Sequence, residues 1–181
     1  MENIKNEPAY SKSVLEFITV ANDFCIFMEK VASYNETDVF NYLQKVSPLL
    51  YLKASLLPDV HVEDPSANER FVTLEQYEDI FNALRSKILD HDVFWYIDLD
   101  SPDENLPVKG SIAESYADSY QDLKDFLLLY QKNTRVAKQN AVFECKNLFK
   151  EHWSYRLLNA MKAIHHILYK DFSDNKGQEY I

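Results

Sequence analysis

Apolar residues recur at helical spacing along most of the chain, and polar stretches divide the pattern into five segments. In the first segment Val14, Phe17 and Ala21 follow one another at intervals of three or four residues, which is typical of an amphipathic helix. The predicted helices span 11–33, 35–56, 73–89, 111–132 and 134–170. We therefore predict an all-α, single-domain bundle of about five helices, whose last two form a long antiparallel pair.

Several helix ends carry recognisable capping residues. Thr73 and Gln76 form the T-x-x-Q pattern of a capping box, and Ser111 with Glu114 repeats this arrangement at the fourth helix. Pro48 lies inside the second predicted helix, where it removes one backbone hydrogen bond. We expect either a kink at this proline or a restart of the helix there.

Residues 92–100 (DVFWYIDLD) interrupt the helical pattern with a dense aromatic run. We expect an extended segment laid over the bundle, at most a single short strand. The next residues, SPDENLPVKG, contain two prolines and a glycine and predict a loop. Both chain ends are polar, so we place the bundle domain at 11–171, with an N-terminal tail at 1–10 and a frayed C-terminal tail at 172–181.

Composition narrows the classes of function. The 181 residues include only two glycines, so neither a dinucleotide-binding G-x-G-x-x-G nor a Walker A loop is present. The formal net charge of −10 disfavours nucleic acid as a partner. The sequence has no signal peptide and no apolar stretch of membrane-spanning length, so we expect a cytoplasmic protein without a membrane partner. In such a compartment Cys25 and Cys145 are expected to be buried free thiols.

Four acidic residues share one face of the predicted helix 111–132, namely Glu114, Asp118, Asp122 and Asp125. At about 100° per residue they fall within one sector of the helix, opposite the tyrosines and leucines of the obvious core face. We therefore expect these carboxylates to face water.

The alternative interpretation of this face is a divalent metal site. Mg²⁺ and Mn²⁺ bind several oxygen ligands at once, and carboxylates on two adjacent helices could provide them. This alternative predicts a metal-dependent hydrolase, acting on a nucleotide, and its candidate ligands are Asp118, Asp122 and Asp125 with Glu144 or Glu151. Outside this alternative we expect no cofactor.

Three polar residues lie along an apolar stripe of the predicted helix 134–170. Arg156 falls near the middle of the stripe, and His152 and Asn159 follow its edge. An unpaired buried charge costs several kcal/mol, so we expect a buried Arg156 to pair with Asp98 or Asp100. The three residues form either an internal structural network or a binding or acid–base site. The predicted stripe consists of Val142, Cys145, Phe149, Trp153, Ala160, Ala163 and Ile167.

The aromatic residues offer a second candidate site. Trp95 and Tyr96, beside Asp98, could line a pocket, or they could fill the core. A groove near Trp95 and Trp153 is the place where we expect a ligand. Exposed aromatic side chains would instead form an interaction surface. Arg85 and His91 resemble the Arg-x4–6-His signature of helical ribonucleases of the HEPN superfamily, but the negative net charge opposes RNA binding.

Longer runs of the chain resemble a family of bacterial helical proteins known as a domain of unknown function. The runs that carry the resemblance include ANDFCIFMEK, NERFVTLEQYEDIFNALRSK, FWYIDLD and HWSYRLLNAMKAIHHILY. The similarity covers roughly residues 14–169. It implies an all-helical intracellular bacterial protein, and it transfers no catalytic residue.

The sequence therefore favours a non-enzymatic protein-interaction or ligand-binding module. Its partner is expected to be an unknown protein or small molecule, and the chain is expected to act as a monomer or homodimer. The candidate binding residues are His152, Arg156, Asn159, Trp153, Trp95 and Asp98.

Overall fold

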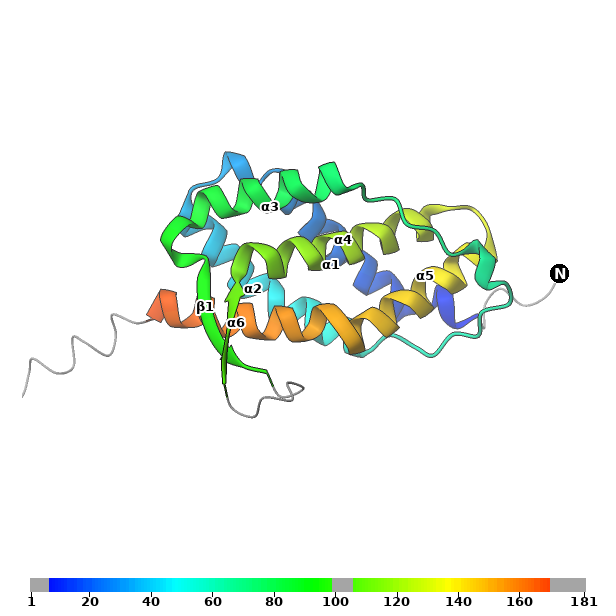
Figure 1. Ribbon diagram of the computed structural model, residues 1–181. Coiled ribbons are helices and arrows are strands. Elements are labelled where there is room, and N and C mark those ends of the chain that lie inside the picture. Colours follow the sequence, from blue (N-terminus) through cyan, green and yellow to red (C-terminus); the bar gives the residue numbers. More distant parts are fainter. Residues whose placement is uncertain (1–6, 99–105, 170–181) are drawn as a thin grey trace, which may run out of the picture.

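The helices predicted from apolar spacing form five rods (Figure 1). The computed structural model describes residues 7–98 and 106–169. A π-helix, Phe149–Trp153, joins α5 to α6 in one rod, so the prediction of an all-α bundle of about five helices is confirmed. Within the described ranges the α-helices are α1 (Lys12–Glu29), α2 (Glu36–Ser55), α3 (Leu74–Ile88), α4 (Ile112–Gln131), α5 (Arg135–Leu148) and α6 (Ser154–Tyr169).

The predicted helix ends agree with the capping residues. Thr73 and Gln76 form a complete capping box at α3, and the Ser111 side chain accepts a hydrogen bond from the Glu114 backbone N–H at α4. α2 continues through Pro48 as one helix, so the predicted restart at this proline is wrong.

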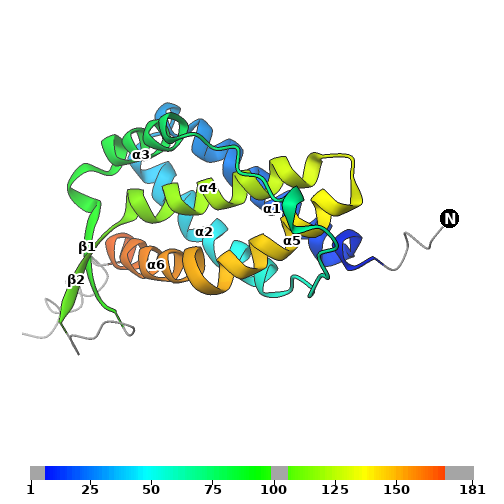
Figure 2. The same cartoon turned by 45° about the vertical axis from the view of Figure 1, so that its right-hand side comes forward.

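α4 runs through the middle of the bundle and packs against α1, α3, α5 and α6 (Figures 1 and 2). Small side chains on α4, such as Ala113, Ala117 and Ser119, are fully buried and let neighbouring rods approach closely. Most of the 20 residues of α4 are therefore buried, and no broad face is left for water.

The π-helix changes which face of the last rod is buried. Its wide turn holds one extra residue, which turns the helix beyond it relative to regular α-helical spacing, although Ala160 is buried as predicted. Leu157 and Ile164 are buried where regular α-helical spacing predicted Arg156 and Ala163. The prediction of a core Arg156 is wrong, because this side chain is 40 % exposed.

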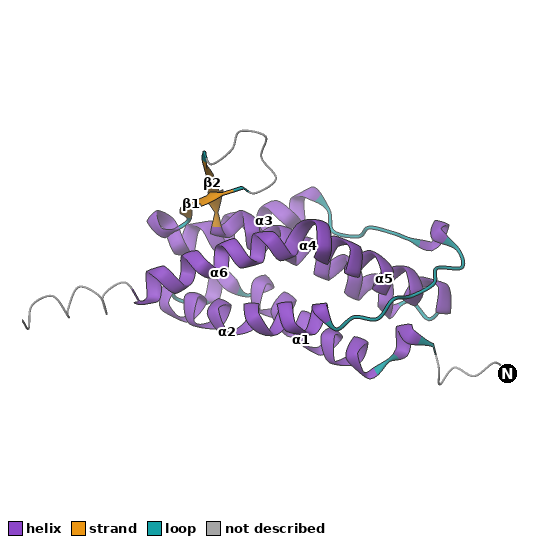
Figure 3. Ribbon diagram, turned by 90° about the horizontal axis from the view of Figure 1, so that it is seen from below, coloured by secondary structure: helices purple, strands orange, loops and turns teal. Residues whose placement is uncertain are grey.

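A two-stranded hairpin connects α3 to α4 and stands out from the body of the bundle (Figure 3). β1 (Val93–Ile97) pairs antiparallel with β2 (Pro107–Ser111). The first strand confirms the predicted extended segment. The second strand was missed, because a proline and a glycine within it are typical of a loop.

The two faces of β1 differ in exposure. Val93, Trp95 and Ile97 are exposed, whereas Phe94 and Tyr96 are partly buried. The Phe94 ring lies over its cross-strand partner Gly110, where an added Cβ would come within 2.6 Å of the ring. Glycine at this position thus lets the hairpin close against its own aromatic side chain.

A long connection between α2 and α3, residues 56–73, is called the strap below. It runs past α5 and returns along α4 to the start of α3 (Figure 1). Polar contacts fasten it to α5. Lys146 Nζ lies 2.7 Å from Asp59 Oδ1, and Asn140 Nδ2 donates to the Asp64 carbonyl at 2.8 Å.

At its N-terminal end the bundle begins slightly before its predicted start at residue 11. Ala9 is fully buried, and its carbonyl accepts a hydrogen bond from Tyr130 Oη at 2.9 Å. Residues 1–6 of the predicted N-terminal tail and the whole predicted C-terminal tail, 172–181, lie outside the described residues.

The two cysteines, Cys25 and Cys145, are buried free thiols, as predicted. Burial raises the pKa of both thiols, which keeps them protonated. Within residues 7–98 and 106–169, no helix combines the length and apolarity that a membrane crossing requires.

Candidate functional site

Much of the acidic face of α4 is covered, although Glu114 at its start is 53 % exposed, as predicted. The Asp122 and Asp125 side chains are only 5 % and 6 % exposed, so the prediction of a solvated face is wrong for both. The cause is the central position of α4, because the strap lies over the face that helical projection assigned to water.

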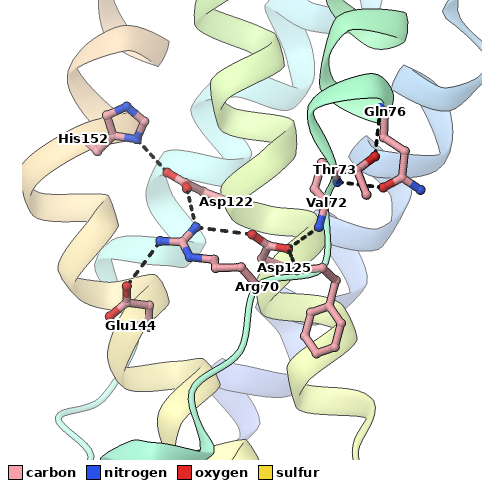
Figure 4. Close-up of polar contacts among 9 residues, drawn as sticks. Arg70, Val72, Thr73, Gln76, Asp122, Asp125, Glu144 and His152 are labelled. Atoms are coloured by element: carbon pink, nitrogen blue, oxygen red, sulfur yellow. Dashed lines mark hydrogen bonds and ion pairs between the residues drawn. The ribbon is translucent and has the colours of Figure 1, made fainter.

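Arg70 of the strap is the cation that contacts this buried acidic cluster (Figure 4). Its Nη1 lies 3.1 Å from Asp122 Oδ1 and 3.3 Å from Asp125 Oδ2. Its Nη2 lies 3.3 Å from Glu144 Oε1 on α5. One guanidinium therefore links the strap to two helices, and the fork of N–H groups suits several carboxylates at once.

Asp125 also holds the backbone at the end of the strap (Figure 4). Its Oδ1 accepts hydrogen bonds from the backbone N–H groups of Phe71 and Val72 at 2.7 and 2.8 Å. Val72 directly precedes Thr73, the N-cap of α3. The buried carboxylate thus satisfies two backbone donors just before α3 begins.

Two further pairs join α4 to the last rod. His152 Nδ1 lies 2.7 Å from Asp122 Oδ2, and Arg156 Nη1 lies 2.6 Å from Asp118 Oδ2. The hydrogen bond to Asp122 raises the pKa of His152 above its ordinary value, with burial opposing the rise. These contacts make the polar residues of both helices one interhelical network.

The ion-pair partner of Arg156 differs from the prediction. Arg156 pairs with Asp118 and, at 4.0 Å, with Glu114 of α4, rather than with Asp98. Asp100 lies outside the described residues. Because Arg156 is displaced from the core by the π-helix, it reaches carboxylates at the edge of α4.

The arrangement gives no support to the alternative of a metal-dependent hydrolase. Arg70 lies among Asp122, Asp125 and Glu144, where a bound cation would have to be. Asp118 is engaged by Arg156 and by the hydroxyl of Tyr77, which donates to it at 2.8 Å. Within the described ranges, no group of three or more His, Cys, Asp or Glu side chains is placed to hold a metal ion.

The hairpin crosses α6 and leaves a pocket on each side of the crossing. Phe94, Tyr96 and Asn159 line both pockets, so these residues mark the boundary between them. We call the two cavities the β1-side pocket and the β2-side pocket.

The β1-side pocket has a volume of about 680 Å³. Its hairpin wall is aromatic, and Trp95 within that wall is 66 % exposed. α6 contributes Ala163 and Ile167 to the opposite side. Val93 adds a further apolar side chain, and the other lining residues carry polar groups, namely Asp90, His91, Asn159, Lys162 and His166.

The β2-side pocket, of about 480 Å³, is the more polar of the two. It brings together four of the predicted candidates, Asp98, His152, Arg156 and Asn159. Its walls also carry Lys109, Glu114, Glu151 and Tyr155. The Arg156–Glu114 ion pair between α6 and α4 therefore lies at the wall of this pocket.

The two tryptophans are separated. Trp95 lines the β1-side pocket, whereas Trp153 is fully buried against Phe17 and Phe149. The indole Nε1 of Trp153 has no hydrogen-bond partner in the described part of the chain. Trp153 therefore belongs to the core, as its place in the predicted apolar stripe indicated, and it does not share a groove with Trp95.

The ribonuclease-like pair is engaged in other contacts. His91 Nδ1 lies 2.6 Å from Glu36 Oε1, and Arg85 Nε lies 3.8 Å from Asp92 Oδ2. Each side chain thus contacts a different carboxylate, and the pair forms no shared site.

Arg70 and Lys162 were not among the predicted residues. Arg70 lies in a polar loop, where a charged side chain carries no sign of burial. The spacing of Asp122 and Asp125 could have revealed it, because it places two carboxylates on one side of a helix. If another segment covers that side, the two carboxylates need a cation as partner. Lys162 gave no signal, because the fold alone brings the hairpin over it.

These features define a class of protein, a helical bundle with a hairpin arm across its last helix and a pocket on each side of the arm. The chain belongs to the family described as Domain of unknown function (DUF5063), whose model matches residues 8–170. This finding confirms the resemblance seen in the sequence.

A solved structure agrees with this assignment. The crystal structure of protein BF1032 from Bacteroides fragilis is 33 % identical to this chain and superposes with a TM-score of 0.79. The similarity covers 89 % of this chain and 95 % of that one. No curated protein matches the chain.

Proposed function

We propose that this protein is a ligand-binding module and that the β1-side pocket is its binding site. The observation that carries the proposal is the exposed indole of Trp95 on the wall of a cavity of about 680 Å³. Small-molecule sites have volumes of roughly 300–1,000 Å³ and are lined mainly by apolar and aromatic groups with a few polar ones.

The energetics of Trp95 support this proposal. An exposed indole leaves a large apolar area in contact with water, and covering that area with a ligand is favourable by about 25 cal/mol per Å². The hairpin itself is anchored, because Phe94 and Tyr96 are partly buried beneath it. A pre-formed aromatic wall binds with little loss of conformational entropy.

The polar residues first considered for chemistry support binding over catalysis. Asp122, Asp125 and Arg70 hold the strap to α4, and His152 holds the last rod to the same helix. Their roles in the fold are accounted for by these contacts. The β1-side pocket, by contrast, has an aromatic wall whose exposure no internal contact accounts for.

The test uses phenylnaphthylamine, an uncharged probe whose fluorescence rises in apolar sites. We expect one saturable site on the wild-type chain. Trp95→Ala is expected to weaken binding about ten-fold, because the main stacking surface is lost. Ala163→Phe fills the pocket from α6 and should weaken binding at least as much.

Tyr155→Ala is the matched control. Tyr155 is an aromatic residue of similar exposure, 57 % against 66 % for Trp95, but it lines the β2-side pocket. Its substitution should leave probe affinity unchanged, and thermal melting followed by circular dichroism establishes that every variant is folded. Equal affinities for wild type, Trp95→Ala and Ala163→Phe would refute the proposal.

A further inference from the structure

We infer that the β1-side pocket takes a planar aromatic ligand that carries a negative charge. The inference rests on the proposed function and adds the chemical class of the ligand. It draws on three features of the pocket, namely the arrangement of side chains on α6, the nitrogen donors of its rim, and the aromatic wall opposite.

The α6 side of the pocket consists of two parallel rows of residues. Asn159, Ala163 and Ile167 follow one another at four-residue intervals, and Lys162 and His166 do the same beside them. Residues four apart stack on one side of a helix. The first row therefore forms a floor with a small alanine at its centre, and the second row forms a rim of two nitrogen-bearing side chains.

The floor and the hairpin wall together favour a flat ligand. Trp95 lines the pocket from the exposed face of β1, and Phe94 and Tyr96 line it from the partly buried face of the same strand. Ala163 lies on the opposite side and leaves open space that a larger side chain would fill. A planar ring can contact the indole face over its whole area, and such stacking adds to the free energy of simple burial.

The rim favours an anion. Within residues 7–98 and 106–169, neither Lys162 nor His166 makes an ion pair or a side-chain hydrogen bond, although the chain is rich in acids. Other lysines, such as Lys124 and Lys146, are paired with carboxylates at 2.6 and 2.7 Å. Lys162 therefore retains its charge and its donors for a group from outside the chain.

The other ionisable groups of this pocket do not reverse that preference. His91 is bound to Glu36, so its ring is already engaged. Among the described residues that line the pocket, Asp90 is the one acid, and it belongs to the short turn at the foot of the hairpin. A ligand stacked on Trp95 with its anionic group beside Lys162 and His166 satisfies both the wall and the rim.

The experiment compares two probes that share one aromatic frame. Anilinonaphthalene sulfonate carries a sulfonate, and phenylnaphthylamine lacks it. We expect Lys162→Gln to weaken the sulfonate probe about five-fold and Lys162→Glu more than ten-fold, with less than a two-fold change for the uncharged probe. Lys45→Gln, an exposed lysine on α2, is the matched control and should change neither affinity.

The possible outcomes separate this inference from the proposed function. If both probes bind in a Trp95-dependent manner but Lys162→Gln changes their affinities equally or not at all, the anionic class is wrong and the binding site stands. If neither probe binds to the wild-type chain, the proposed function fails as well. A selective loss of affinity for the sulfonate probe in Lys162→Gln supports the inference. The affinity of the wild-type chain for this probe should also fall with added salt.

Discussion

Arg70 determines how a buried acidic cluster can exist in this fold. Its guanidinium is 46 % exposed, but Asp122 and Asp125 beneath it are almost completely covered. Carboxylates removed from water need a charge partner and hydrogen-bond donors, and here one strap residue and two backbone N–H groups supply them. The cluster thus fixes the position of the strap over α4 and α5.

The first prediction concerns Arg70→Met. Two buried carboxylates would lose their cation, so we expect a loss of about 1–3 kcal/mol in unfolding free energy, measured by urea denaturation. Arg135→Met is the matched control, because Arg135 has the same 46 % exposure but pairs with Glu63 and Glu7, which are 41 % and 17 % exposed and so less buried than Asp122 and Asp125. Its loss should stay below about 1 kcal/mol. Similar losses for both variants would contradict a special role for Arg70.

A second prediction concerns the pH dependence of the His152–Asp122 pair. The pKa of His152 is raised in the folded chain, chiefly by its hydrogen bond to Asp122. Its stabilisation is therefore complete below the unfolded imidazole pKa of about 6.5, and it is lost as pH rises through the higher folded value.

His152→Ala should accordingly destabilise the protein more at about pH 5.5 than at about pH 9. Solvent screens this partly exposed pair, so we expect the difference to be about 1 kcal/mol or less. His61→Ala, at an exposed strap position, serves as the control. A difference of opposite sign, measured by urea denaturation at both pH values, would rule out the proposed cause of the shift.

At the scale of elements, the π-helix between α5 and α6 decides which residues face the core. The five residues Phe149–Trp153 absorb one position relative to a regular helix. Leu157 and Ile164 consequently face inward, and Arg156 reaches Asp118 at the edge of α4. The pocket residues of α6 owe their orientation to the same turn.

The third prediction is that deleting Lys150, an exposed residue of the π-helix, is tolerated. The deletion converts the wide turn to a regular one and leaves the buried faces of α5 and α6 in place. We expect a cooperative transition and a loss of at most about 2 kcal/mol.

Deletion of Gln121 in α4 provides the contrast. α4 has no wide turn to absorb the change, so the half of the helix beyond the deletion would rotate by about 100°. We expect this variant to lose cooperative thermal unfolding in circular dichroism. Equal tolerance of the two deletions would show that the π-helix does not set the register.

At the scale of the whole molecule, α4 makes the bundle one cooperative unit, because it contacts four of the other helices. The buried side chains of α4 and the buried Trp153 should therefore become exposed to water in the same unfolding transition. The two tryptophans can test this, since one is fully buried and the other is 66 % exposed.

The fourth prediction uses single-tryptophan variants. In Trp95→Phe the emission of Trp153 should shift strongly on urea unfolding, with the same midpoint as far-ultraviolet circular dichroism. In Trp153→Phe the emission of the exposed Trp95 should change little. A separate midpoint for Trp153 would indicate that the last rod unfolds independently of the bundle.

Much of the fold could be predicted from the sequence. The helix boundaries at Thr73 and Ser111 follow from capping side chains, which act on backbone groups a few residues away. The apolar spacing along each rod and the family resemblance likewise depend on the chain alone. These features were predictable because they arise from neighbours in the sequence.

The candidate site was only partly predictable for the opposite reason. His152, Arg156, Asn159 and Asp98 do meet in one pocket, but helical periodicity could not tell which side of a rod would be covered. That depends on where other segments lie.

What the sequence determined, then, is the set of rods and the relative angles of side chains around each of them. Tertiary structure alone decided that the strap would bring Arg70 onto the acids of α4, and that a wide turn would exchange Arg156 for Leu157 in the core. The physical reason is that burial is a property of contacts between distant segments, whereas periodicity describes one segment at a time.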